Sequence, residues 1–66
     1  MLKMKALRLV AGLTQKDVCE AIGVSKPTLI KWETGAAIPS DDDLQRMADF
    51  YRCKPKDLLK ENARVK

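Results

Sequence analysis

The segment that decides the fold runs from residue 23 to residue 35 and reads Gly23-Val-Ser-Lys-Pro-Thr-Leu-Ile-Lys-Trp-Glu-Thr-Gly35. Ser25 is of a residue type that is favoured immediately before a helix. Pro27 suits a first turn, because the amide that proline lacks would have no partner within the helix there. Leu29 and Trp32 follow at helical spacing and share one face. The segment therefore predicts a helix that begins after Ser25, buries Leu29 and Trp32, and ends at the closing glycine.

A second helix is expected immediately before this segment, starting after Thr14. The Thr14 hydroxyl can accept a hydrogen bond from the Asp17 amide while the Asp17 carboxylate reaches back, an aspartate version of the capping box. The buried face of this helix is predicted to consist of Val18, Cys19 and Ile22. Because only residues 23–25 join the two helices, we expect the helices to cross steeply, which is the helix-turn-helix arrangement.

Three further helices are predicted around this pair. The first spans residues 2–11, another begins after Ser40 with three aspartates in its first turn, where negative charge is favoured, and the last spans residues 55–61. Their inward-facing residues are expected to be Met4, Leu7 and Ala11, then Leu44, Met47, Ala48 and Tyr51, then Leu58. The expected fold is an all-α, compact five-helix domain over residues 1–61, followed by a short C-terminal tail over residues 62–66.

The composition indicates one small domain with an anionic partner. A domain near 66 residues buries only ~60% of its unfolded surface, so self-association is an expected source of extra stability. The apolar content of 45% is normal for a folded protein. Lys and Arg outnumber Asp and Glu by 13 to 9, and the pI is about 9.3, which favours an anionic partner.

Membrane, metal and enzyme functions are not indicated by the sequence. No run of ~20 apolar residues and no secretion leader is present, so we expect a cytoplasmic protein. The chain has no histidine, and Cys19 and Cys53 lack zinc-site spacing, so no metal or cofactor is expected. The two cysteines are interpreted as reduced core thiols, with a disulfide as the alternative. No nucleophile–base constellation is visible, so no catalytic residue is assigned.

Residues 2–61 resemble the Cro and lambda-type repressor helix-turn-helix family, also called the XRE family. The most specific motifs are "LR…GLTQ", "GVS…W-E-TG", "IPS" and the closing "DLL". The resemblance implies a lambda-repressor-like DNA-binding domain, bacterial or phage-encoded, that acts as a dimer on a partly palindromic operator. In such a dimer the two recognition helices lie about 34 Å apart.

The family contacts bases from the first turn of the recognition helix and from one turn later. The corresponding positions here are Lys26, Pro27, Thr28 and Lys31. Lysine can donate to guanine and a threonine methyl can touch a thymine methyl, whereas proline offers only shape. The alternative interpretation is that Lys26 and Lys31 are part of a solvated helix face.

The resemblance also implies phosphate contacts and scaffold roles. Phosphate contacts are expected from Gln15 and Lys16 at the start of the second helix, and from the chain at Thr34 and Ala36. The loop after Thr34 lacks the basic residue that many relatives have, so the ionic contribution should be smaller. Scaffold roles are expected for an Arg8–Glu33 ion pair and for a dimer interface formed by Pro55, Leu59 and Val65.

These observations predict a sequence-specific regulator of transcription, a Cro-like repressor that binds double-stranded DNA in the major groove. No membrane and no small-molecule ligand are expected as partners. The alternative is an antitoxin or another protein-interaction module in which DNA binding is secondary. Such a protein interface would be sought at the C-terminal tail and at Ile30, which occupies a position that is usually polar in the family.

Overall fold

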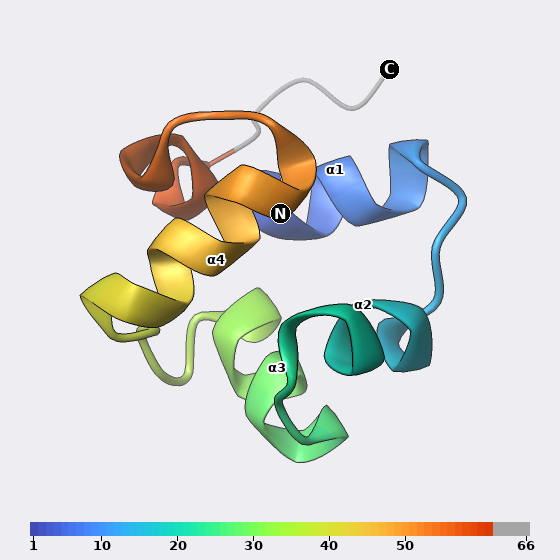
Figure 1. Cartoon of the computed structure of the whole chain (residues 1–66). Coiled ribbons are helices and arrows are strands. Elements are labelled where there is room, and N and C mark those ends of the chain that lie inside the picture. The colour runs from blue at the N-terminus through green and yellow to red at the C-terminus, as the bar shows by residue number, and fades with distance from the viewer. Residues whose placement is uncertain (62–66) are drawn as a thin grey trace.

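The computed structural model describes residues 1–61, which form an all-α fold (Figure 1). Among these residues the extended backbone is paired only at an isolated bridge between Leu2 and Glu61. The all-α prediction is confirmed, but the five-helix count is not, because the structure has four α-helices and the last element is a short 3-10 helix. The elements are α1 (Lys3–Val10), α2 (Gln15–Ile22), α3 (Lys26–Thr34), α4 (Asp41–Tyr51) and η1 (Pro55–Leu59).

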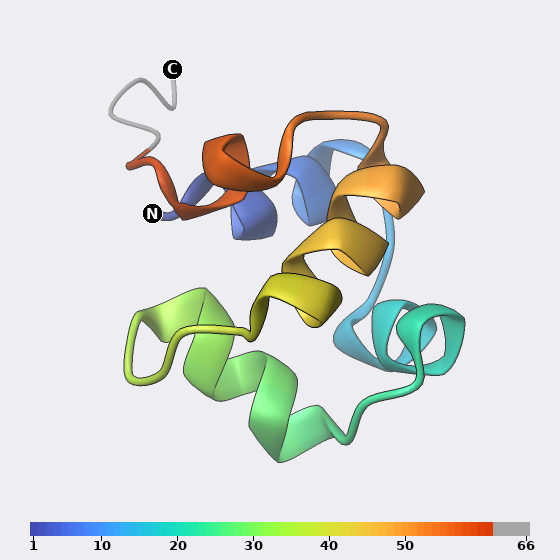
Figure 2. The same ribbon diagram turned by 60° about the vertical axis from the view of Figure 1, so that its left-hand side comes forward.

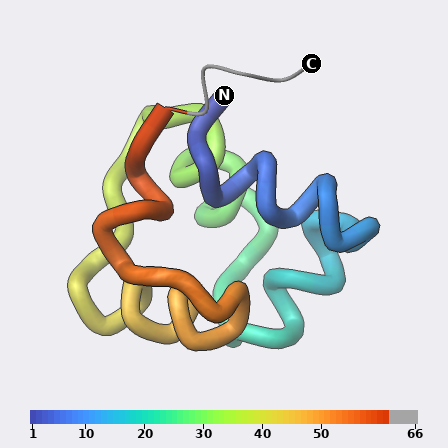
Figure 3. The backbone as a smooth tube through the Cα atoms, turned by 90° about the horizontal axis from the view of Figure 1, so that it is seen from above, coloured from blue at the N-terminus to red at the C-terminus, as the bar shows by residue number. Residues whose placement is uncertain are grey.

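After η1 the chain pairs with the N-terminal segment. Lys60 has extended backbone angles, and its carbonyl oxygen accepts a hydrogen bond from the Lys3 N–H at 2.8 Å. The chain therefore leaves the helix at Lys60, and the Lys60 carbonyl oxygen pairs with the start of α1. Figure 3 shows the first and last described segments lying close together.

The core lies where all five elements meet. Its largest fully buried side chains come one from each element in chain order: Met4, Val18, Leu29, Met47 and Leu58. Burying one such side chain contributes roughly 1.5–3 kcal/mol. On the predicted face of α1, Met4 is buried and Leu7 packs half-buried against the core, whereas the prediction for Ala11 is wrong, because this residue is exposed at the helix end. Tyr51 faces inward as predicted: it is half-buried and packs against the core.

Side-chain caps define the starts of α2 and α4, as the sequence predicts. The Asp17 N–H donates to the Thr14 hydroxyl at 3.0 Å, and the Thr14 N–H donates to the Asp17 carboxylate at 2.9 Å. Hydrogen bonds from the Thr14 backbone and side chain lower the pKa of the Asp17 carboxyl below its usual value. Ser40 accepts from the Asp43 N–H at 3.3 Å, with three aspartates in the first turn of α4.

The fold separates two ends of the molecule. Figures 1 and 2 show α1 and η1 together at one end, and the N-terminal part of α3 at the opposite end. The largest dimension of the molecule is 30 Å. No helix within residues 1–61 has the length and apolar character that crossing a membrane requires.

Candidate nucleic-acid interface

The turn between α2 and α3 is closed by one carbonyl group. The N–H groups of Gly23 and Val24 donate to the Cys19 carbonyl oxygen, at 2.8 and 3.1 Å. This geometry needs Gly23 at φ +77°, a left-handed conformation that glycine adopts without steric cost. Val24 then packs against the core, and α3 starts across α2 rather than beside it (Figure 1).

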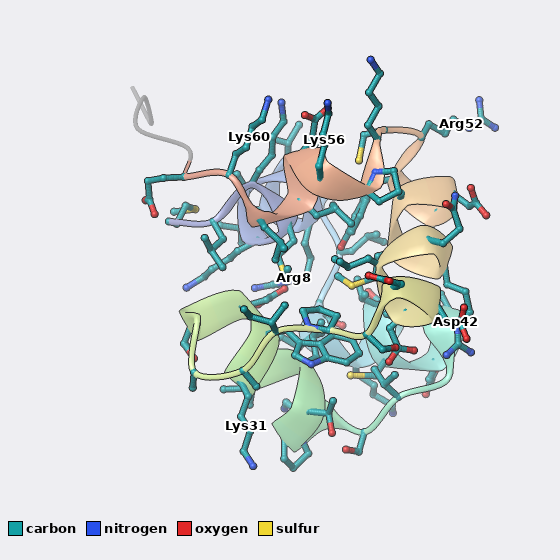
Figure 4. The ribbon with its side chains drawn as sticks, turned by 90° about the vertical axis from the view of Figure 1, so that its left-hand side faces the viewer. Arg8, Lys31, Asp42, Arg52, Lys56 and Lys60 are labelled. Carbon is teal, nitrogen blue, oxygen red and sulfur yellow. The ribbon has the colours of Figure 1, made fainter. Side chains whose placement is uncertain are left out.

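The two faces of α3 differ in burial. Leu29, Trp32 and Glu33 are buried and fix the helix to the body. The opposite side and the first turn are open to solvent and consist of Lys26, Pro27, Ile30, Lys31 and Thr34. In Figure 4 the Lys31 side chain projects away from the body at the end of the molecule formed by α3. The N-terminal half of α3 is therefore an exposed rod that could enter a groove.

The four residues predicted to contact bases lie together in this rod. Lys26, Pro27 and Lys31 are exposed, and Thr28 is half-buried. No acidic side chain lies among residues 24–32 of the chain, so the rod itself carries only positive charge. The four predicted residues therefore share one accessible surface. Their side chains offer hydrogen-bond donors and a methyl group, which can contact the edges of bases.

Ser25 and Thr28 interact in a way that the sequence analysis missed. Ser25 stands at the N-cap position of α3, but its side chain does not cap the helix. Instead the Ser25 and Thr28 hydroxyl oxygens lie 2.8 Å apart and share a hydrogen bond. Pro27 leaves one fewer amide in the first turn for a cap to satisfy, which frees the Ser25 hydroxyl. The serine–threonine spacing of three residues around a proline is the sequence signal for this pair.

The residues predicted to contact phosphates differ in exposure and in the hydrogen bonds that they already make. Lys16 is exposed at the start of α2. The Ala36 N–H donates to no backbone carbonyl within the described residues, so it remains free to donate to a phosphate oxygen. The Thr34 hydroxyl, in contrast, donates to the Ile30 carbonyl oxygen at 2.9 Å and would have to rotate to reach a phosphate.

Gln15 is connected to a buried ion pair behind the helix-turn-helix. Arg8 donates to the Glu33 carboxylate through Nε at 2.8 Å and through Nη2 at 3.1 Å. The exposed fractions of these two side chains are 9% and 2%. Arg8 also donates to the Leu13 carbonyl oxygen at 3.0 Å, and Gln15 Nε2 lies 3.4 Å from Glu33 Oε1. The pair thus ties α1, the following loop and the start of α2 to the end of α3.

Two titratable groups near the Arg8–Glu33 ion pair, Cys19 and Tyr51, have raised pKa values, which favour their neutral forms. Burial, and then the Glu33 charge, raise the pKa of the Cys19 thiol. Burial, and then Glu33, also raise the pKa of Tyr51 to about 12. The Tyr51 hydroxyl is buried and makes no hydrogen bond within residues 1–61. Neither group has the lowered pKa that an activated nucleophile requires.

The predicted dimer residues lie at the other end of the molecule. Pro55 and Leu59 are half-buried in η1. Val65 lies outside the described residues.

Comparisons with known proteins agree with the helix-turn-helix geometry. The sequence model of the helix-turn-helix family matches residues 4–58. The chain is 30% identical over 60 residues to the cryptic phage CTXphi transcriptional repressor RstR of Vibrio cholerae. It is 36% identical over 57 residues to an uncharacterized HTH-type transcriptional regulator of Methanocaldococcus jannaschii, and 32% identical over 57 residues to the HTH-type transcriptional activator BcrR of Enterococcus faecalis.

The extent of these matches differs among the relatives. The aligned part covers 91% of this chain but 54% of the Vibrio repressor, and 86% of this chain but 28% of the Enterococcus activator. It covers 86% of both this chain and the archaeal regulator. No solved structure matches the chain. The match over residues 4–58 and the arrangement of α2 and α3 show that this chain belongs to the XRE-type helix-turn-helix family of DNA-binding transcription regulators.

Proposed function

We propose that the protein is a sequence-specific regulator that inserts the N-terminal half of α3 into the major groove of an operator. The observation that carries this proposal is the division of α3 into a buried face and an exposed, acid-free rod. Burial of Leu29, Trp32 and Glu33 holds the helix in position, so its exposed residues remain available to a ligand. Bases are contacted by Lys26, Pro27, Thr28 and Lys31.

In this proposal the backbone contacts come from both sides of the rod. Lys16 and Gln15 approach one phosphate from the start of α2, where helix amides also favour an anion. The Ala36 amide approaches another phosphate after α3, and Thr34 contributes after its hydroxyl rotates. These contacts set the position of α3, while the lysines and Thr28 supply specificity.

The protein acts as a dimer on a partly palindromic operator and represses transcription by occupying promoter DNA. The phage repressor among the relatives supports repression, and the half-buried Pro55 and Leu59 supply apolar surface for a two-fold contact. A dimer would place two α3 helices in successive major grooves, about 34 Å apart.

Selection from random double-stranded oligonucleotides at a fixed salt concentration tests this proposal. We expect a consensus with two inverted half-sites whose centres lie about 10 bp apart. Recovery of a single half-site would contradict the dimer while keeping sequence-specific binding. Recovery of no consensus would contradict the function itself.

A second candidate, an antitoxin-like protein-interaction module, is favoured by one observation. Ile30 on α3 and Ile38 in the following loop are exposed, at 38% and 73%. Co-purification of a stoichiometric protein partner, lost on Ile30→Ser and Ile38→Ser substitution, would support this function. If both variants keep operator affinity and no partner appears, the antitoxin function is contradicted.

A further inference from the structure

The exposed side of α3 carries two apolar side chains between two lysines. Pro27 and Ile30 are three residues apart, so they lie close to one another on the helix surface. Around the helix axis, Lys26 lies on one side of these two residues and Lys31 on the other. We call Pro27 and Ile30 the apolar pair. Both residues are exposed, so the pair faces solvent in the free protein.

The fold does not use the Ile30 side chain. The core contacts of α3 come from Leu29 and Trp32, and Ile30 is neither in the core nor packed against it, with an exposed fraction of 38%. A single exposed apolar residue is normal in a folded protein, so exposure alone decides nothing. The position of Ile30 carries the argument, because it stands one turn after Lys26 and directly before Lys31 on the side of α3 that is turned away from the core.

The apolar pair offers no free polar atom to a base. Proline has no N–H group, and the Ile30 carbonyl oxygen accepts a hydrogen bond from the Thr34 hydroxyl at 2.9 Å. The Thr28 hydroxyl, farther round the helix, shares its hydrogen bond with Ser25, with the two oxygens 2.8 Å apart. Between the lysines, α3 therefore presents carbon atoms, and the charged donors stand on either side.

We infer that Ile30 is a further base-contacting residue, and that the apolar pair packs on the 5-methyl group of a thymine in each operator half-site. This inference rests on the proposed function. With α3 in the major groove, Lys26 and Lys31 approach base edges, so the residues between them approach base edges as well. Thymine is the one base that presents a methyl group in the major groove. The half-site should therefore contain a thymine whose methyl group is recognised by Ile30.

The surroundings of Ile30 favour DNA over a protein partner. The cores of protein interfaces are depleted in lysine and enriched in aromatic residues, Met and Arg. The apolar pair has a lysine on each side and belongs to a rod without acidic side chains. Such a surface matches a methyl group that lies between phosphates and hydrogen-bond acceptors of base edges.

Removal of single methyl groups from the operator tests the inference with the full chain. The operator recovered by oligonucleotide selection is prepared with each thymine of one half-site replaced in turn by deoxyuracil, which pairs in the same way but lacks the methyl group. At one position the wild-type protein should bind about fourfold more weakly, which is the effect of losing one buried methyl contact. At that position 5-methylcytosine should be bound about fourfold more tightly than cytosine, for the same reason.

Three variants assign the methyl contact to its side chain. Ile30→Ala should bind the thymine and deoxyuracil operators equally, whereas Ile30→Val should keep most of the difference. Alanine has the higher helix propensity and Ile30 lies outside the core, so the fold is kept, as circular dichroism verifies. Ile38→Ala is the matched control, because Ile38 is 73% exposed in the loop after α3 and its variant should keep the full difference.

Three results would overturn the inference. If the wild-type protein binds every deoxyuracil operator as tightly as the thymine operator, Ile30 is a solvated residue or belongs to a protein interface. If Ile30→Ala keeps the difference between thymine and deoxyuracil, another side chain makes the methyl contact. If Ile38→Ala loses the difference as well, methyl recognition is not specific to α3. Failure of the proposed function is seen separately, as absence of any consensus in the selection.

Discussion

The two ends of the molecule carry their lysines in different ways. At the α3 end, three lysines stand on and beside a helix that is fixed from behind by Leu29, Trp32 and a buried ion pair. The opposite end, called the basic pole, carries Lys3, Arg52, Lys54, Lys56 and Lys60. These side chains come from the start of α1, the end of α4 and the short η1 with its two flanking residues. The α3 end therefore offers few charges in defined positions, whereas the pole offers more charge with less positional definition.

Position and charge contribute differently to DNA recognition. Phosphate contacts provide affinity that depends on salt, while base contacts provide discrimination only when side chains are held in register. The net negative charge of residues 6–51 means that specificity at the α3 end must depend on its scaffold. Substitutions in the scaffold should therefore have larger effects than substitutions of single lysines.

The largest expected effect follows from loss of the buried ion pair. Glu33→Gln leaves the Arg8 guanidinium buried without its counter-charge, which should lower the free energy of unfolding by about 3–5 kcal/mol. The total stability of a domain of this size is about 3–10 kcal/mol, so this loss is severe. Urea denaturation at low temperature measures the change. As the control at the pole, Lys60→Ala should leave the urea midpoint unchanged; an equal loss there would contradict the comparison.

The next effect concerns a single lysine in the recognition rod. Lys31→Ala should weaken binding to the selected operator by ~1–3 kcal/mol and reduce discrimination at one base pair. Titration against duplexes with each base pair changed in turn measures both quantities. Lys16→Ala is the matched control, because its loss should be uniform across sequences, with a salt slope lower by about one. Identical behaviour of the two variants would contradict the division between base and phosphate contacts.

A smaller effect is expected where α4 ends. Arg52 adopts φ 60° and ψ 51°, a left-handed conformation that costs a non-glycine residue roughly 1–2 kcal/mol. Arg52→Gly should therefore raise the free energy of unfolding, by up to about 1 kcal/mol. A thermal melt of the variant beside the wild-type protein tests this expectation. A lower melting temperature would mean that the arginine side chain stabilises this end.

The smallest effect is a pH dependence at the start of α2. The Thr14 hydrogen bonds lower the pKa of Asp17 in the folded state, so the contribution of Asp17 to stability is present above its unfolded value. That contribution is lost as the pH falls from about 5 through the folded pKa. Wild-type protein should have a higher urea midpoint than Asp17→Asn at pH 7, and the two midpoints should converge near pH 2.5. A constant difference over this range would contradict the assignment.

The sequence predicted the helix-turn-helix well because its signals are local. Gly23, the Thr14–Asp17 capping box and the spacing of Leu29 and Trp32 each act within one or two turns of chain. The resemblance to the helix-turn-helix family was recognised from the same part of the sequence. The candidate site was predicted as a group of residues, and four of them lie together on α3.

The parts that could not be predicted depend on contacts between distant segments. After η1 the chain is extended and pairs with the start of α1 through the Lys3–Lys60 hydrogen bond, which joins residues 57 positions apart. The end of α4 is set by a left-handed arginine, where a sequence signal would have been glycine or asparagine. The Ser25–Thr28 hydrogen bond depends on side-chain rotamers, and the separation of charge between the two ends appears only once α1 and η1 are brought together.

The most direct test of the central claim is a titration of isotope-labelled full chain with the selected duplex, followed through backbone amide NMR signals. We predict that at one equivalent the largest shifts fall on residues 26–31 and on Gln15 and Lys16. Largest shifts at residues 54–60 with unchanged signals along α3 would contradict the account.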